Sequence, residues 1–172
     1  IGCADGRIGK RDIHTAADSD NMWSISQEEL MERMTESCKA TVDHFAPHIC
    51  FINTLRNMSV DCDCMGVEAA PVVTPNVGIV ASLDILAADQ ASVDLLYSLP
   101  RGGGKTMIER IETRHGLRQL SYMKELGMGS DRYTLVDTDN ADALITAAEA
   151  VKDVEPGWRA DRYNTFRGRN RF

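Results

Sequence analysis

Short, β-branched apolar runs alternate with stretches of helical periodicity, and this alternation constrains the fold more than any other feature of the sequence. The segment Ser26-Gln27-Glu28-Glu29 fits a capping box, and the apolar residues that follow recur at helical spacing until Pro47 ends the predicted helix. Residues 48–55 then form a short apolar run that predicts a buried strand. Such alternation is typical of an α/β fold: a layered sheet of a few mostly buried strands with flanking helices.

The same alternation continues to about residue 151. It predicts strands over residues 77–81 and 133–136, a helix from a cap at Asp84 to about Leu99, and further helices over residues 106–114, 118–126 and 141–151. The length of 172 residues allows one domain with one core. We therefore expect a single α/β domain over residues 1–156, loop-rich over residues 1–25, followed by a basic C-terminal tail over residues 157–172.

Charge is distributed unevenly. The chain has 19 Lys and Arg against 26 Asp and Glu, a net charge of −7, yet the tail has a net charge of +4 and leaves −11 on the rest. Nucleic-acid-binding domains are usually basic, so this balance argues against a nucleic-acid partner. No apolar run approaches the length needed to span a bilayer, which argues against a membrane role.

The five cysteines indicate a compartment and a chemistry. An odd number cannot pair completely within the chain, and the first residues contain no apolar secretory segment. Both observations favour a cytoplasmic location, where clustered cysteines more often bind metal or carry redox chemistry than form disulfides.

The segment Asp61-Cys62-Asp63-Cys64 is the most informative one for function. In an extended backbone its two thiols share one face, and a metal ion relieves the repulsion between neighbouring thiolates. A tetrahedral site needs four ligands, so Cys3 is the candidate for a third and His14 for a fourth. The alternatives are a pair of small residues in a polar loop and, for His14, a surface histidine.

Three other side chains are given structural roles. Cys38 lies on the apolar face of a predicted helix and Cys50 within a predicted strand, so both are expected to pack in the core. Asp89 stands among alanines, but the pattern favours a solvated helix face for it. The Gly102-Gly103-Gly104-Lys105-Thr106 segment is not expected to bind nucleotide, because the first glycine of a phosphate loop is absent and a helix precedes the segment.

Several stretches taken in order resemble the domain-of-unknown-function family 362. They are Gly2-Cys3-Ala4 with Arg7, Gly9-Lys10 and Ile13-His14 behind it, Phe51-Ile52-Asn53 leading into the Asp-Cys-Asp-Cys segment, residues 71–82 and 88–92, and motifs between Leu120 and Leu135. The resemblance implies an iron–sulfur protein linked to electron transfer. Members often carry a ferredoxin-type insert with Cys-x-x-Cys-x-x-Cys runs, and this chain has only a short polar link at the corresponding place, between about Ala16 and Gln27.

These observations favour a cytoplasmic metal- or iron–sulfur-binding protein with a redox role, whose site contains Cys3, Cys62, Cys64 and His14. The cofactor is expected to be an iron–sulfur cluster or a single iron or zinc ion, iron being favoured by the resemblance and zinc being equally suited to thiolates. The alternative is a binding module, with structural zinc or no metal, that docks on a redox protein. Its acidic body and basic tail would also suit a homo-oligomer, although a disordered terminus is the favoured interpretation of the tail.

Overall fold

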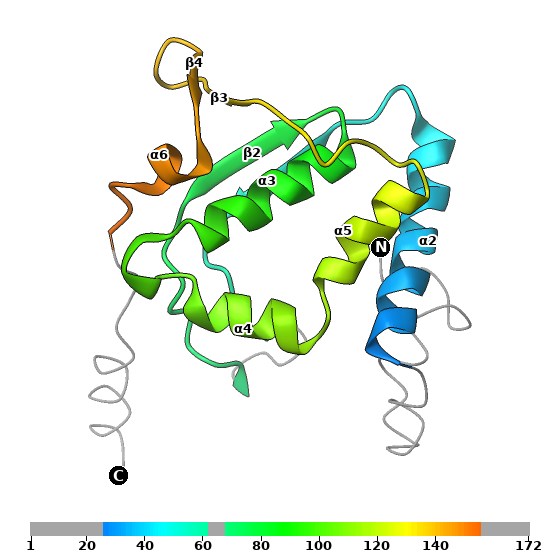
Figure 1. The fold of residues 1–172 in the computed structure, drawn as a ribbon, viewed down its shortest axis with the longest axis horizontal. Coiled ribbons are helices and arrows are strands. Elements are labelled where there is room, and N and C mark those ends of the chain that lie inside the picture. Colours follow the sequence, from blue (N-terminus) through cyan, green and yellow to red (C-terminus); the bar gives the residue numbers. More distant parts are fainter. Residues whose placement is uncertain (1–25, 62–67, 156–172) are drawn as a thin grey trace.

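The computed structural model of the chain, shown in Figure 1, describes residues 26–61 and 68–155. Its longest helix, α2 (Gln27–Phe45), begins where the sequence predicts, because the Ser26 hydroxyl oxygen accepts a hydrogen bond from the Glu29 N–H at 3.1 Å. The helix ends before Pro47, as expected. One side of α2 packs against α5 (Leu117–Glu125), and Cys38 on that apolar face is 4% exposed. The predicted core position of Cys38 is therefore confirmed.

Strands β1 (Phe51–Leu55) and β2 (Gly78–Ser82) form an antiparallel pair, with Asn53 opposite Val80. Side chains alternate between the two faces of the pair, so one face packs on α3 while Ile52 and Ile79 point away from it and stay exposed. These strands are thus buried on one face, whereas the sequence predicts strands that are mostly buried.

Helix α3 (Ile85–Tyr97) is the central element, because it contacts both of these strands and α4, α5 and α6. Asp84 caps it as predicted: one carboxylate oxygen accepts the Ala87 N–H at 3.0 Å. The other oxygen accepts the Ser130 N–H at 2.8 Å and so ties the segment after α5 to the start of α3. Two clusters of buried side chains meet on α3. One contains Leu55, Leu95, Leu96, Leu99 and Val151, and the other contains Cys38, Ile85, Leu86 and Met123.

After α3 the chain passes through the short helix η2 (Pro100–Gly102) into α4 (Lys105–Thr113). A helix, not a strand, therefore precedes the glycine-rich segment, which agrees with the rejection of a phosphate loop. Gly127 follows α5 with φ +67°, the left-handed conformation that ends helices.

The C-terminal part contains a second antiparallel pair, β3 (Leu135–Asp137) and β4 (Ala143–Ile145), followed by α6 (Ala147–Val151). The predicted helix over residues 141–151 is therefore wrong in its first half. Thr146 begins α6 with a capping box, since its hydroxyl oxygen accepts the Glu149 N–H at 3.2 Å and the Glu149 carboxylate accepts the Thr146 N–H at 2.8 Å.

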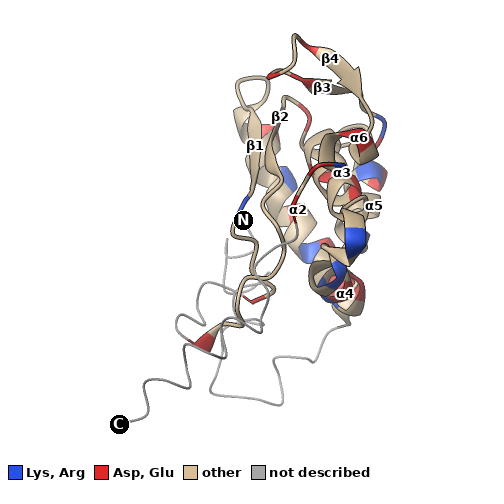
Figure 2. Cartoon of the chain, turned by 90° about the vertical axis from the view of Figure 1, so that its left-hand side faces the viewer, with Lys and Arg blue, Asp and Glu red and all other residues tan. Residues whose placement is uncertain are grey.

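Helices and two small antiparallel sheets together confirm the mixed α/β class. Figure 2 shows that many of the charged residues lie on the helices, whereas β1 and β2 contain none. Within residues 26–61 and 68–155, no helix combines the length and apolar character that crossing a membrane requires. The predicted loop-rich segment 1–25 and the basic tail lie outside the described residues.

Candidate functional site

All four predicted metal ligands, Cys3, His14, Cys62 and Cys64, lie outside the described residues. The structure does describe the residues on both sides of the 62–67 segment that contains the cysteine pair. Among the residues that it describes, no three His, Cys, Asp or Glu side chains gather closely enough to hold a metal ion.

The Asp61 carboxylate, immediately before the cysteine pair, accepts hydrogen bonds from two different parts of the chain. Arg110 of α4 donates from Nε to the Val60 carbonyl oxygen at 2.8 Å and from Nη2 to Asp61 Oδ1 at 3.2 Å. On the far side of the segment, the Ala70 N–H donates to Asp61 Oδ2 at 2.8 Å. One carboxylate thus joins helix α4 to both ends of the cysteine segment. Sequence patterns did not single out Arg110, because its partners lie about 50 residues away along the chain.

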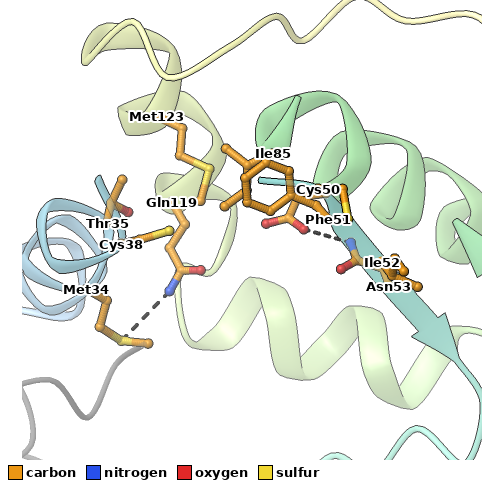
Figure 3. Close-up of a pocket in the computed structure, with 11 residues that line it drawn as sticks. Met34, Thr35, Cys38, Cys50, Phe51, Ile52, Asn53, Ile85, Gln119 and Met123 are labelled. Carbon is orange, nitrogen blue, oxygen red and sulfur yellow. Dashed lines mark hydrogen bonds between the residues drawn. The ribbon is translucent and has the colours of Figure 1, made fainter. Parts of the chain in front are cut away.

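A cavity of about 340 Å³ lies between α2, α3, α5 and the residues at the start of β1. Figure 3 shows its walls: Met34 and Cys38 come from α2, Phe51 and Asn53 lie opposite, and Met123 stands between them. Cys50 also lines this cavity and is exposed. The predicted core position of Cys50 is therefore wrong, because β1 begins one residue later and Phe51, not Cys50, points inward.

Asp89 is a half-buried member of the cavity wall, so the favoured prediction of a solvated face is also wrong. Asn53 Nδ2 donates to Asp89 Oδ1 at 2.7 Å and lies 3.0 Å from Ser92 Oγ, and Ser92 donates in turn to the Ala88 carbonyl oxygen at 2.7 Å. This network holds the carboxylate in place. A polar Asn53 at an inward-facing position of an apolar strand was the sequence signal for it.

Burial dominates the electrostatics of this wall. It raises the pKa of the Asp89 carboxyl above its ordinary value of 3.8, and the hydrogen bond from Asn53 partly opposes that rise. Burial, and then the negative charge of Asp89, raise the pKa of the Cys38 thiol. Cys38 is consequently a protonated thiol at neutral pH and a poor nucleophile or metal ligand. This agrees with its predicted role in packing.

The histidines near these elements show no shared site. His44 and His48 are exposed on either side of the turn after α2, and the His44 ring packs edge-on against Phe45 with centroids 4.8 Å apart. His115 contacts Glu28 across the α2–α5 interface.

The described residues define a mixed α/β protein in which hydrogen bonds join Asp61 to Ala70, on the far side of residues 62–67, and to Arg110 of α4. Residues 1–94 match the family described as Domain of unknown function (DUF362), and this span is more than half of the chain. The chain therefore belongs to that family. Neither a curated protein nor a solved structure matches it. The matched span includes α2, β1, β2, most of α3 and all four of the predicted metal ligands.

Proposed function

We propose that this chain binds an iron–sulfur cluster or a single iron or zinc ion through Cys3, Cys62 and Cys64, with His14 as a further ligand, and serves a redox role. The observation that carries the proposal is the anchoring of Asp61 at both ends of the 62–67 segment, next to two thiols spaced by one residue. Fixing the ends of a ligand loop reduces the conformational entropy that ordering it around a metal costs.

The donor set fits this kind of cofactor. Thiolate and imidazole ligands suit iron–sulfur clusters, iron and zinc. When bound, a cluster supplies one-electron transfer, whereas a zinc ion with four protein ligands supplies structural stability. Arg110, which donates to the Val60 carbonyl oxygen and to Asp61, is assigned the role of a positioning residue.

Location and partner follow from the same proposal. Free thiolates that bind metal are maintained in a reducing cytoplasm. The net charge of −11 outside the tail, against +4 within it, supports docking on a redox protein with complementary charge or on a second copy of the chain.

The test is metal analysis and visible absorption of anaerobically purified protein. Iron with acid-labile sulfide would support the cluster, and stoichiometric zinc in a colourless protein would support the structural site. The Cys62→Ser and Cys64→Ser variants should lose the metal, whereas Cys50→Ser, which changes an exposed cysteine outside the ligand set, should keep it. Absence of metal from the anaerobic wild type would overturn the proposal.

A second pair of variants tests the anchor. Arg110→Ala removes the hydrogen bonds to Val60 and Asp61 but none of the ligands, and we expect metal affinity to fall about tenfold, the lower end of the loss seen when supporting residues of a metal site are changed. Lys105→Ala, at an exposed position on the same helix, is the control and should bind as the wild type does. Equal affinity of both variants would remove the anchoring argument.

A further inference from the structure

The cavity between α2, α3, α5 and the start of β1 has the dimensions of a small-molecule site. Its volume of about 340 Å³ falls at the lower end of the range of ligand pockets, roughly 300–1,000 Å³. Four elements contribute to its walls, so its shape depends on the folded domain and not on one flexible loop. A role for this cavity rests on its described lining residues alone and requires none of the metal ligands proposed above.

The described walls of the cavity contain an acidic side chain and no basic one. Among its described lining residues, Asp89 is the one carboxyl group, and no Lys or Arg is found there. A carboxylate removed from water is costly unless a positive charge or several hydrogen bonds compensate it. Among the described residues, one side chain, that of Asn53, donates a hydrogen bond to the Asp89 carboxylate, and its acceptor is Oδ1. Oδ2 keeps its acceptor capacity, since an ionised carboxylate accepts about four hydrogen bonds.

The remaining walls suit an apolar group attached to a cation. Phe51 presents an aromatic ring, and rings attract ammonium and guanidinium groups through their negative faces. Ile85 and the thioethers of Met34 and Met123 supply adaptable apolar surface. Gln119 Nε2 donates to the Met31 sulfur at 3.2 Å, which leaves the Gln119 carbonyl oxygen as a second acceptor in the wall.

We propose that this cavity binds a small organic cation, a protonated primary amine with a short apolar body, whose ammonium group pairs with Asp89. An anion would meet the carboxylate with the same sign of charge. A metal ion is disfavoured because no three ligating side chains of the described residues come together there. A neutral ligand would leave the carboxylate without a positive partner.

The test uses the full chain and benzylamine, which is protonated at neutral pH, as the probe. Calorimetric titration, with the methyl resonances of Met34 and Met123 followed by NMR, should show saturable binding. Benzyl alcohol has the same ring without the charge and should bind about tenfold more weakly, since a charge-assisted hydrogen bond is roughly twice as strong as a neutral one. Equal binding of amine and alcohol, or no saturable binding of the amine, would overturn the proposal.

Variants locate the site. Asp89→Asn keeps the size of the side chain and an acceptor for Asn53, and it should remove the preference for amine over alcohol. Glu109→Gln removes the same charge from an exposed position of α4 and should leave that preference unchanged. Met34→Trp, which fills the cavity, should abolish binding of both probes. An amine preference that survives Asp89→Asn would place the binding elsewhere and contradict the assignment.

Discussion

Gly104 shows how a single residue fixes the junction of α3 and α4. It is buried, and a Cβ atom added there would lie 2.4 Å from the Leu96 carbonyl oxygen, which belongs to the backbone of α3. A backbone atom cannot swing aside as the end of a side chain can. We therefore expect Gly104→Ala to lower the free energy of unfolding by about 1–3 kcal/mol, the usual cost of overpacking. Urea denaturation measures this directly.

Gly102 provides the comparison for that variant. It has φ +70°, but a Cβ atom there would meet nothing within 4 Å. Gly102→Ala should cost only the left-handed backbone conformation, about 1 kcal/mol. If Gly102→Ala were the more damaging of the two, conformational strain and not the close approach to α3 would control this junction.

The raised pKa of Asp89 predicts how the stability of the protein changes with pH. Its pKa is raised in the folded state, so the folded state holds the proton more tightly than the unfolded state does. Its contribution to stability is fully present below the ordinary value of 3.8 and is lost as pH rises through the folded-state pKa. Asn does not titrate, so Asp89→Asn should gain stability relative to the wild type as pH rises. Urea unfolding from about pH 3 to about pH 7 measures the difference.

Subtracting the unfolding free energy of the wild type from that of Asp89→Asn removes the contribution of the other carboxyl groups, because both proteins contain them. Glu109→Gln, at an exposed position, shows how much any lost negative charge contributes. Parallel stability curves for the wild type and Asp89→Asn would mean that Asp89 has the same pKa in the folded and unfolded states.

Individual residues also show where sequence reasoning succeeds. Helical spacing places Cys38 on the apolar face of α2, and the structure buries it there. The placement of Cys50 depends on where β1 begins, and a shift of one residue moves a side chain to the other face of a strand. Asp89 faces inward because α3 is covered on most sides, and the packing of neighbouring elements is not visible in the local pattern around Asp89.

At the scale of elements, a row of glutamates on α2 contacts polar side chains on α5 or just before it. Glu28, Glu32 and Glu36 follow one another at intervals of four, the spacing that aligns side chains on one face of a helix. Their partners on or just before α5 are His115, Arg118 and Tyr122, in the same order. Arg118 also contacts Glu125 at 2.6 Å, so it belongs to two ion pairs.

A double-mutant cycle with Glu32→Gln and Arg118→Gln tests this row. Arg118→Gln should lower the urea midpoint more than Glu32→Gln, because it removes both ion pairs, and the two effects should be less than additive. All these groups lie near the surface, so the coupling should be small and should shrink at high salt. Additive effects at low salt would show that the Glu32–Arg118 pair contributes nothing to joining α2 and α5.

The elements with explicit start signals were the ones predicted best. Ser26 and Asp84 cap α2 and α3 as the sequence indicates. Strand β3 overlaps the strand predicted over residues 133–136, whereas β4 was missed, because a three-residue strand is too short to show a period and the alanines around it favour a helix. The sequence did contain a signal for the true start of this helix. Thr146 and Glu149 have the spacing of a capping box, which predicts that α6 begins at residue 147.

At the scale of the whole molecule, α3 packs directly on one face of the β1–β2 pair and in turn contacts α4, α5 and α6. Figure 2 shows the pair seen from the side, with α2 and α3 both lying to one side of it. The family match ends within α3, yet the core cluster at the end of that helix uses Leu95, Leu96, Leu99 and Val151 from beyond the match. The family segment and the residues after it therefore share one core cluster.

The outward face of β1 and β2 supports the last prediction. Ile52 is 63% exposed and Ile79 is 67% exposed, so the burial of these two side chains contributes little to the stability of the folded state. Replacing both with Thr keeps a β-branched side chain. We expect a change in the free energy of unfolding within about 0.5 kcal/mol, as for most surface substitutions, and weaker fluorescence of a dye that binds apolar surface.

Val80→Thr is the matched control, because Val80 lies on the inward face of β2 and packs against the core cluster that contains Leu55. It places a hydroxyl among apolar side chains and should cost about 1–3 kcal/mol. The ratio of the two changes in unfolding free energy measures how much more the inward face of the β1–β2 pair is buried than its outward face in solution. If the outward double substitution were as costly as Val80→Thr, another part of the protein would have to cover that face, and Ile52 and Ile79 would be core residues.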